Sequence, residues 1–338
     1  PVSRVEGHGK VTLLLDEAGH VREARLHIVE FRGFEKFIQG RPYWEVPVMV
    51  QRLCGICPVS HHLAAAKALD PVVGAVTITP TAEKIRRLMH YGQVLQSHAL
   101  HFFHLSSPDL LFGFESPVQQ RNIVGVAGAY PEVARQGVLL RKFGQEVIRI
   151  TAGKRVHGTG SVPGGFNKPL SMADRDLMRA DIGQIIAWCD SALALARDLF
   201  LRGQPEQGRF ANFPSGFMSL VRPDGAADLY DGALRVKDAQ GQLIVDQVDV
   251  HDYQHLIVEE VKPWTYMKFP HLRTLGPEHG WYRVGPLARI NNATYLDTPR
   301  AEAARAEFIA WGGGQPVTAS LAQHWARMID TLHCAEGI

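Results

Sequence analysis

Cysteine is scarce in this sequence of 338 residues, which has only Cys54, Cys57, Cys189 and Cys334. Four cysteines are too few for a disulfide scaffold in so long a chain and fit a reducing compartment. Net charge is almost absent, at +2, so there is no bulk electrostatic case for binding nucleic acid or anionic membrane. No apolar run approaches the ~20 residues of a membrane span. GxGxxG and GxxxxGK[ST] phosphate-binding motifs are also missing, so we expect no nucleotide site here.

Alternating apolar and polar residues predict two β-hairpins. The first pairs residues 10–16 with 21–30, and the second spans 233–250 around an Asp-Ala-Gln-Gly turn at 238–241. Segments 158–165 and 205–225 are rich in Gly and Pro, and we expect loops there.

Helical periodicity dominates the rest of the chain. Thr79-Pro80-Thr81-Ala82-Glu83 has the pattern of a helix start, followed by apolar positions at helical spacing. The predicted helices span 58–70, 81–105, 131–152, 171–202, 299–311 and 318–336. No repeat or clean linker divides the chain. We therefore predict an α+β protein that is mainly α with small flanking β-sheets, folded as a single domain over 1–338 with a large helical-bundle core.

Cys54-Gly55-Ile56-Cys57 is the most informative segment, because two thiolates so spaced can bind one soft metal ion. A CxxC by itself is also compatible with a redox dithiol, half of a zinc site, or chance. A thioredoxin-like dithiol would need a βαβ unit, which the flanks do not show. A zinc site would need two more ligands, and the chain has no second CxxC. A helix starting after Cys57 would favour its thiolate form.

The longer string Arg-Leu-Cys-Gly-Ile-Cys, followed by three residues and His61, resembles the N-terminal cysteine motif of nickel–iron hydrogenase large subunits. Four further segments resemble elements of that family, in family order: Arg4–Gly9, Arg32–Glu35, Ser161–Gly165 and Val284–Arg289. Within the family, segments Glu30–Phe37, Cys57–His62 and Ala65–Leu69 are most similar to the soluble, bidirectional NAD-reducing enzymes.

This resemblance implies a role for five residues. Cys54 and Cys57 would hold nickel, and Cys57 would also bridge to an iron carrying carbon monoxide and cyanide ligands. His61 would donate a hydrogen bond to a ligand sulfur. Glu6 would pass protons to and from a nickel thiolate. Glu35 would belong to a separate hard-metal site, usually magnesium.

Each of these roles has a structural alternative. His61 alone would be interpreted as a capping or core histidine, Glu6 as a solvated acid, and Glu35 as a surface ion-pair partner of Arg32. His98, His101 and His104 recur every three residues, and we expect core or interface positions rather than a metal site. Cys189 and Cys334 are interpreted as buried packing residues.

As a member of this family the chain would catalyse reversible heterolytic oxidation of H2 in the cytoplasm. Electrons would pass to iron–sulfur clusters in a small partner subunit, because four cysteines cannot hold both metals and clusters. A diaphorase module carrying FMN would then reduce NAD+. The alternative from another functional class is a non-catalytic H2-sensing or complex-I-like scaffold subunit.

The family's second cysteine pair, in an Asp-Pro-Cys-x-x-Cys motif, is not in this sequence. The chain starts at Pro1 without methionine and stops at Ile338 after an apparent helix, so we expect it to be incomplete at both ends. Two thiolates alone would leave nickel half-ligated, and we would not expect the isolated 338 residues to turn over H2.

Overall fold

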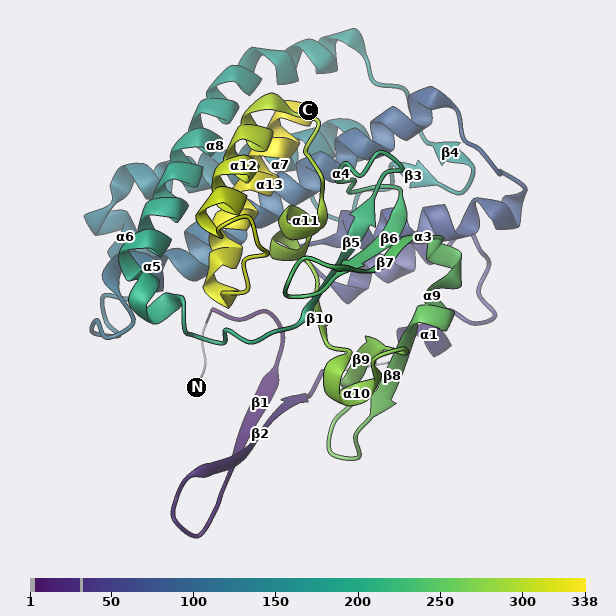
Figure 1. The fold of residues 1–338 in the computed structure, drawn as a ribbon. Helices are drawn as coiled ribbons and strands as arrows, with labels where there is room; N and C mark the ends of the chain where they lie inside the picture. Colours follow the sequence, from purple (N-terminus) through teal and green to yellow (C-terminus); the bar gives the residue numbers. More distant parts are fainter. Residues whose placement is uncertain (1–3, 31–32) are drawn as a thin grey trace.

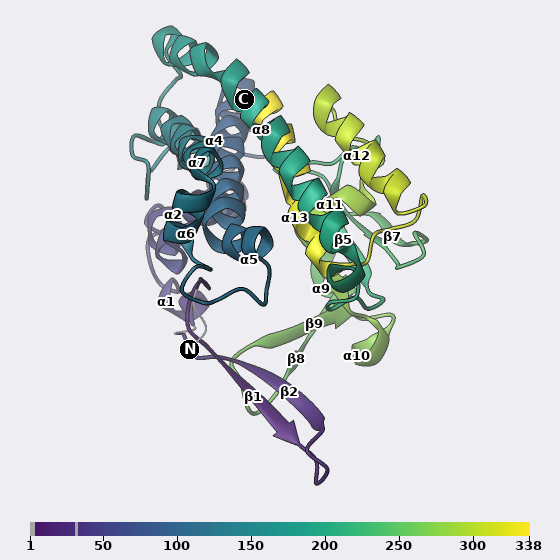
Figure 2. The same ribbon diagram turned by 90° about the vertical axis from the view of Figure 1, so that its left-hand side faces the viewer.

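The computed structural model describes residues 4–30 and 33–338, and Figure 1 shows a mainly helical body flanked by small sheets. Four long helices form its centre: α4 (Pro80–Leu100), α7 (Pro131–Ala152), α8 (Met172–Gln207) and α13 (Gln323–Gly337). Helix α13 packs against both α4 and α8 and runs alongside α8 in Figure 2. No helix formed by the described residues is long and apolar enough to cross a membrane.

Shorter helices surround this centre. They are α1 (Phe34–Phe37), α2 (Val46–Met49), α3 (Pro58–Leu69), α5 (Ser107–Phe112), α6 (Ile123–Ala129), α9 (Tyr253–Leu256), α10 (Gly276–His279), α11 (Pro286–Asn292) and α12 (Pro299–Trp311). A π-helical turn over His101–Ser106 joins α4 to α5. The largest fully buried side chains include Trp325, Phe102 and Phe200, which place the main core between α4, α8 and α13.

The strands form four separate sheets. One has the order β10–β5–β6–β7, with β10 parallel to β5 and the other neighbours antiparallel. The other three are antiparallel pairs: β1 with β2, β3 with β4, and β8 with β9. The strands are β1 (Gly9–Leu15), β2 (Val21–Ile28), β3 (Ser161–Val162), β4 (Gly165–Phe166), β5 (Gly216–Val221), β6 (Ala233–Lys237), β7 (Leu243–Val248), β8 (Ile257–Val261), β9 (Lys268–Leu272) and β10 (Tyr282–Arg283).

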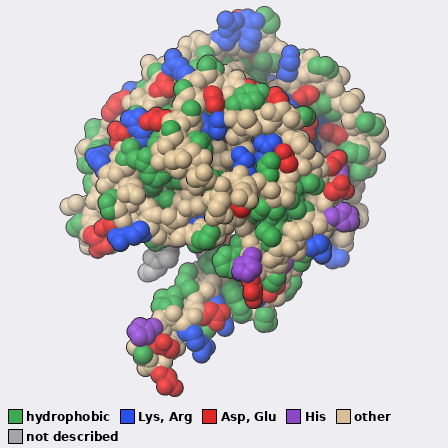
Figure 3. Space-filling model, in the orientation of Figure 1, with side chains coloured by type: hydrophobic (Ala, Val, Ile, Leu, Met, Phe, Trp, Pro, Cys, Tyr) green, Lys and Arg blue, Asp and Glu red, His purple; other side chains and the backbone are tan. Residues whose placement is uncertain are grey.

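The β1–β2 hairpin projects from the body in Figures 1 and 3, and hydrophobic side chains lie along it. Val11, Leu13, Leu15 and Val21 are each more than half exposed on this arm. His27 Nδ1 lies 2.9 Å from the carbonyl oxygen of Trp264, which links the arm to the β8–β9 pair. An apolar arm of this kind is typical of a surface that contacts another protein.

Glycine lets α4 and α7 cross closely. A Cβ added to Gly144 would lie 2.6 Å from the carbonyl oxygen of Gly92, and one added to Gly92 would lie 2.7 Å from Val147 Cγ1. Side chains larger than hydrogen at these positions would push the helices apart. The crossing fixes the position of α4, whose next turns carry residues that hold the CxxC segment.

Most predicted elements are confirmed. Both hairpins form, and four predicted helices match α3, α7, α12 and most of α4. Four predictions were wrong in detail. The 158–165 loop contains strand β3 and the first residue of β4. The 205–225 loop contains strand β5, and helix α8 continues to Gln207 through Pro205 instead of ending at 202. The predicted helix over 318–336 begins only at Gln323, after a short 3₁₀ turn.

Candidate metal centre

The two cysteines of the CxxC segment lie on either side of a tight turn. Cys54 is extended (φ −152°, ψ 126°) after a 3₁₀ turn, and Cys57 is the N-cap of α3, with Pro58 as the first helical residue. The backbone N–H of Cys57 donates to Cys54 Sγ at 3.3 Å. Both side chains are half-buried. A backbone N–H directed at a sulfur is a contact that stabilises a metal-bound thiolate.

Helix α4 holds the turn between the cysteines. The side-chain amides of Gln93 and Gln96 both donate to the carbonyl oxygen of Ile56, at 3.1 and 2.8 Å. Both glutamines are buried, so these bonds are shielded from water. The close α4–α7 crossing therefore contributes directly to the shape of the candidate site.

His62, for which no role was predicted, holds the start of α3 from the other side. Its ring is buried, with Nδ1 2.8 Å from the carbonyl oxygen of Pro47 and Nε2 accepting from the backbone N–H of Ser161 at 3.0 Å. Buried Gln51 adds a bond to the carbonyl oxygen of Gly158 at 3.0 Å. The segment over 158–161 thus supports the CxxC segment from a distant part of the chain.

The thiol of Cys57 is protonated in the absence of a metal. Burial raises its pKa to about 12, helped by the hydrogen bond with Cys54 and by the negative charges of Cys54 and Glu6. The prediction that the helix start would favour the thiolate was wrong, because burial and neighbouring negative charge outweigh the helix end. A bound cation reverses this balance, since metal binding releases the proton.

The other predicted site residues form no hydrogen bond with this pair among the described residues. Glu6 and Glu35 are exposed, and Glu6 is close enough for its charge to act on Cys57. His61 is half-buried, has no hydrogen-bond partner among the described residues, and has its pKa lowered by burial. The proposed Arg32–Glu35 ion pair lies partly outside the described residues. Residues 4–30 and 33–338 contain no group of three or more His, Cys, Asp or Glu that could hold a metal.

Cys57 opens onto a cavity of about 440 Å³ between α3, α4, β5 and α11. His98 of α4 and Arg289 of α11 line it, and Arg289 belongs to the Val284–Arg289 motif. Arg289 Nε donates to Asp330 at 2.9 Å, and His98 Nε2 lies 3.6 Å from the same carboxylate. Burial lowers the pKa of His98 to about 4.

Sequence reasoning missed this cluster of His98, Arg289 and Asp330. His98 was predicted to occupy a core or interface position, and it is buried, but the sequence did not show what it faces. Asp330 belongs to no sequence motif. The only residue of the cluster that a motif contained was Arg289, at the end of the Val284–Arg289 segment. The cluster depends on the packing of α13 against α4 and α11.

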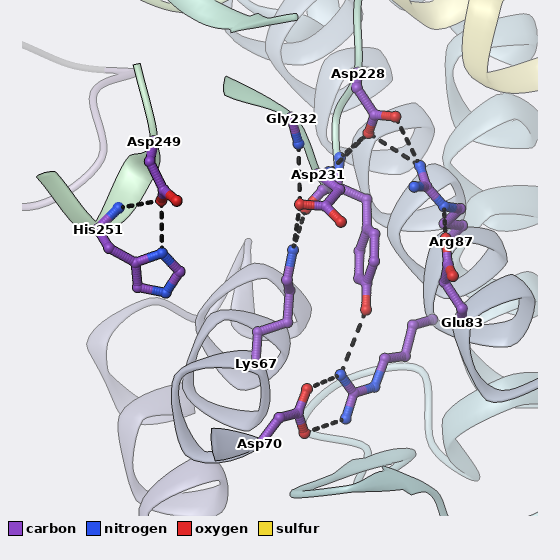
Figure 4. Close-up of polar contacts among 11 residues, drawn as sticks. Lys67, Asp70, Glu83, Arg87, Asp228, Asp231, Gly232, Asp249 and His251 are labelled. Atoms are coloured by element: carbon purple, nitrogen blue, oxygen red, sulfur yellow. Dashed lines mark hydrogen bonds and ion pairs between the residues drawn. The ribbon is translucent and has the colours of Figure 1, made fainter. Parts of the chain in front are cut away.

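A second polar network fixes α3 and α4 to the loop before β6 (Figure 4). Arg87 Nη1 binds both carboxylate oxygens of Asp228 at 3.0 Å, and Lys67 donates to the carbonyl oxygen of Tyr230 at 2.5 Å. The Tyr230 ring lies 4.0 Å from Lys67 Nζ and 4.7 Å from the Arg87 guanidinium. Asp228 also lines the cavity, so this network sets the position of the wall opposite Cys57.

Comparison with known proteins links this geometry to enzymes. The family described as nickel-dependent hydrogenase matches residues 32–112, and one described as HoxL-like matches residues 1–31. The NAD-reducing hydrogenase HoxS subunit beta of Cupriavidus necator is 47% identical, over 99% of this chain and 71% of its own length. One chain of the F420-non-reducing hydrogenase vhu of Methanocaldococcus jannaschii is 40% identical, over 99% of this chain and 79% of its own length.

Solved structures give the same result. A crystal structure of an NAD+-reducing [NiFe]-hydrogenase in the H2-reduced state is 59% identical and has a TM-score of 0.96, covering 99% of this chain and 74% of that one. The [NiFeSe] hydrogenase of Desulfovibrio vulgaris Hildenborough in the reduced state has a TM-score of 0.74 at 22% identity, covering 99% of this chain and 76% of that one. The second similarity shows the fold alone.

Proposed function

The chain belongs to the nickel-dependent hydrogenase family as a [NiFe] hydrogenase large subunit, and from this premise we propose that it oxidises H2 reversibly with NAD+ as the final electron acceptor. The observation that carries the proposal is the Cys54–Cys57 turn, in which the Cys57 N–H donates to the Cys54 sulfur beside a cavity. The likeness to the C. necator protein supports the choice of acceptor. We treat residues 1–338 as one large-subunit domain.

The two thiols of Cys54 and Cys57 are donors that fit nickel and iron. Two soft thiols three residues apart, of which Cys57 lines the cavity, suit nickel and low-valent iron better than a hard ion. We assign both sulfurs to nickel and give Cys57 the second role of bridging to an iron with carbon monoxide and cyanide ligands. When bound, such a centre supplies the splitting of H2 into protons and electrons.

Residues of this chain then accept and transfer the proton. We propose that the Glu6 carboxylate accepts it, because Glu6 is close enough to influence Cys57 and exposed enough to pass the proton to water. We assign His61 a hydrogen bond to a cysteine sulfur, which would lower the basicity of that sulfur. Glu35 would contribute a carboxylate to a separate magnesium site.

Electrons must leave through a partner. The chain's two cysteines outside the metal turn, Cys189 and Cys334, are buried in the core and free, and two could not hold an iron–sulfur cluster. We therefore propose a small iron–sulfur subunit, followed by a diaphorase module with FMN and the NAD site. The exposed apolar hairpin β1–β2 supports a protein partner. Free cysteines also fit a cytoplasmic enzyme.

Infrared spectroscopy tests the proposal on the full-length protein purified with its natural partner subunits. We expect bands in the carbonyl and cyanide stretching region, nickel and iron in equal amounts, and H2-dependent reduction of NAD+. Cys57→Ser should abolish the bands, whereas Cys189→Ser, in the core and away from the cavity, should keep them. Zinc or no metal in the wild-type protein would refute the catalytic assignment. Bands without turnover would favour H2 sensing.

A further inference from the structure

A second cavity, of about 470 Å³, adjoins the metal-centre cavity and shares Val284 with it. Its polar wall includes two arginines and two histidines: Arg283, Arg327, His101 and His324. None of the described residues that line it is Asp or Glu. The cavity is therefore lined by positive charge and by hydrogen-bond donors, without an acid to balance them.

Among the described residues, the contacts of Arg283 are with neutral groups only. Its guanidinium donates to the carbonyl oxygens of Phe213 and Ala211, at 3.0 and 3.1 Å, and to the hydroxyl of Ser320 at 3.2 Å. It also lies 4.2 Å from the centre of the Phe213 ring. These contacts fix its orientation but leave its charge uncompensated, and burial lowers its pKa.

Arg327 is in a similar position. Its Nη1 lies 3.1 Å from His98 Nδ1, and its Nε has no hydrogen-bond partner among the described residues. The carboxylate whose charge acts on it, Asp330, is already bound by Arg289. Burial and the charge of Arg289 lower the pKa of Arg327 to about 10, so it stays protonated at neutral pH.

The two histidines add neutral donors. Their rings lie 5.5 Å apart, and the buried Nδ1 of His324 has no partner among the described residues. Burial and the charge of Arg327 lower the pKa of His324 to about 4, so its ring is neutral at pH 7. Partly buried charges and donors without partners cost free energy, and a bound anion would offset that cost.

We propose that this cavity binds a phosphate group, either as inorganic phosphate or as part of a nucleotide, through side chains and not through the glycine-rich loops whose absence from the sequence predicted no nucleotide site. A phosphate carries close to two negative charges at neutral pH and offers three acceptor oxygens, which match two guanidinium groups without acid partners. A carboxylate would balance only one of the two charges. The cavity volume also leaves room for a nucleoside attached to the phosphate. The inference is independent of the proposed H2 chemistry.

Thermal unfolding and direct titration test this on the full-length protein with its natural partners. Inorganic phosphate and AMP would each replace chloride at constant ionic strength. We expect the unfolding temperature of the wild-type protein to rise with the logarithm of phosphate concentration. Arg327→Gln should weaken phosphate affinity about tenfold or more, since it removes a charge-assisted hydrogen bond. In chloride alone, Arg327→Gln should be at least as stable as wild type, because an uncompensated charge is gone.

Arg179→Gln is the matched control, since Arg179 is an exposed residue of α8 outside the cavity. It should respond to phosphate as wild type does. His324→Asn, which keeps both guanidinium groups, should also weaken binding. Tighter binding of AMP than of phosphate would assign the site to a nucleotide, and equal binding to the free ion. An identical phosphate response in wild type, Arg327→Gln and Arg179→Gln would be a general salt effect and would overturn the proposal.

Discussion

Substitutions of the adjacent residues His61 and His62 should have different effects: replacing His62 should lower stability, and replacing His61 should lower H2 turnover. His62 is 1% exposed, its Nδ1 lies 2.8 Å from the Pro47 carbonyl oxygen, and its Nε2 accepts the Ser161 N–H at 3.0 Å. His62→Leu keeps a buried side chain of similar size but removes the acceptor of the Ser161 N–H and leaves the Pro47 carbonyl oxygen, among the side chains of the described residues, with only the long 3.4 Å contact from Gln51 Nε2. Each such group costs about 1–3 kcal/mol. Taking about 2 kcal/mol for each group, and since the added apolar burial returns up to about 2 kcal/mol, we expect a net loss of about 2–4 kcal/mol.

Urea unfolding of the full-length protein, followed by circular dichroism, measures this loss as a lower midpoint with an unchanged slope. His61→Leu is the matched control one residue away, because His61 is half-buried and has no partner among the described residues. Its free energy of unfolding should stay within about 0.5 kcal/mol of wild type. Its H2 turnover should fall if His61 supports a cysteine sulfur. Equal destabilisation by both variants, or none by His62→Leu, would refute the reasoning.

Three further predictions follow from the same structure. Glu6→Gln should lower H2-driven proton exchange by about 10²–10⁴-fold with nickel and iron still bound. Glu17→Gln, at the hairpin turn, should leave the exchange rate unchanged. An unchanged exchange rate in Glu6→Gln would refute the proton-carrying role of Glu6. Gly144→Ala should destabilise the protein by about 1–3 kcal/mol, because the new Cβ would lie 2.6 Å from a carbonyl oxygen of α4. Gly183→Ala, in open space on α8, should stabilise it slightly. The denaturant midpoints of the two variants test this pair of predictions. Burial lowers the pKa values of His90 and His98 on α4 and of His324 on α13 to about 4. The free energy of unfolding should therefore be highest above pH ~6.5 and fall towards pH 4 as the unfolded chain takes up protons, by at most about 1.4 kcal/mol per pH unit for each histidine. A flat profile of stability against pH in an acid titration would contradict these pKa values.

Local patterns predicted the elements whose own residues determine them. The turn at Asp238 forms as expected, with the carboxylate accepting from the backbone N–H groups of Gln240 and Gln242 at 2.8 Å and Gly241 at φ +82°. The long helices follow their apolar periodicity. These features depend on contacts within a few residues, which a sequence displays directly.

Elements that depend on distant neighbours were missed or misplaced. Strand β5 is a buried run between prolines, and its Gly- and Pro-rich surroundings indicated a loop. It becomes a strand because β6 pairs with it over Phe217–Val221 and β10 pairs with its start. Helix α8 passes Pro205 only near its C-terminal end, where the loss of one backbone hydrogen bond costs least.

The candidate site likewise contains residues that a local motif identifies and residues whose contacts depend on distant parts of the chain. The CxxC spacing identified two sulfurs that can bind one metal, and in the structure they are neighbours across one turn, with Cys57 lining the cavity. The residues that hold this turn, Gln96 and His62, carry no motif of their own. Their partners are single backbone carbonyl and amide groups 15 to 99 positions away, at Ile56, Pro47 and Ser161.

The high pKa of Cys57 bears on two interpretations that the CxxC spacing left open, a redox dithiol and a metal ligand. A redox dithiol needs an attacking thiolate at neutral pH, and such cysteines have lowered pKa values next to positive charge. Here burial, the hydrogen bond and charge of Cys54, and to a smaller extent the charge of Glu6 raise the pKa of Cys57 to about 12, so Cys57 is not the attacking thiolate at pH 7. A cation with strong affinity for sulfur can displace that proton, whereas a disulfide partner cannot supply the charge to do so. The surroundings of Cys57 therefore disfavour it as an attacking thiolate and are compatible with its role as a metal ligand.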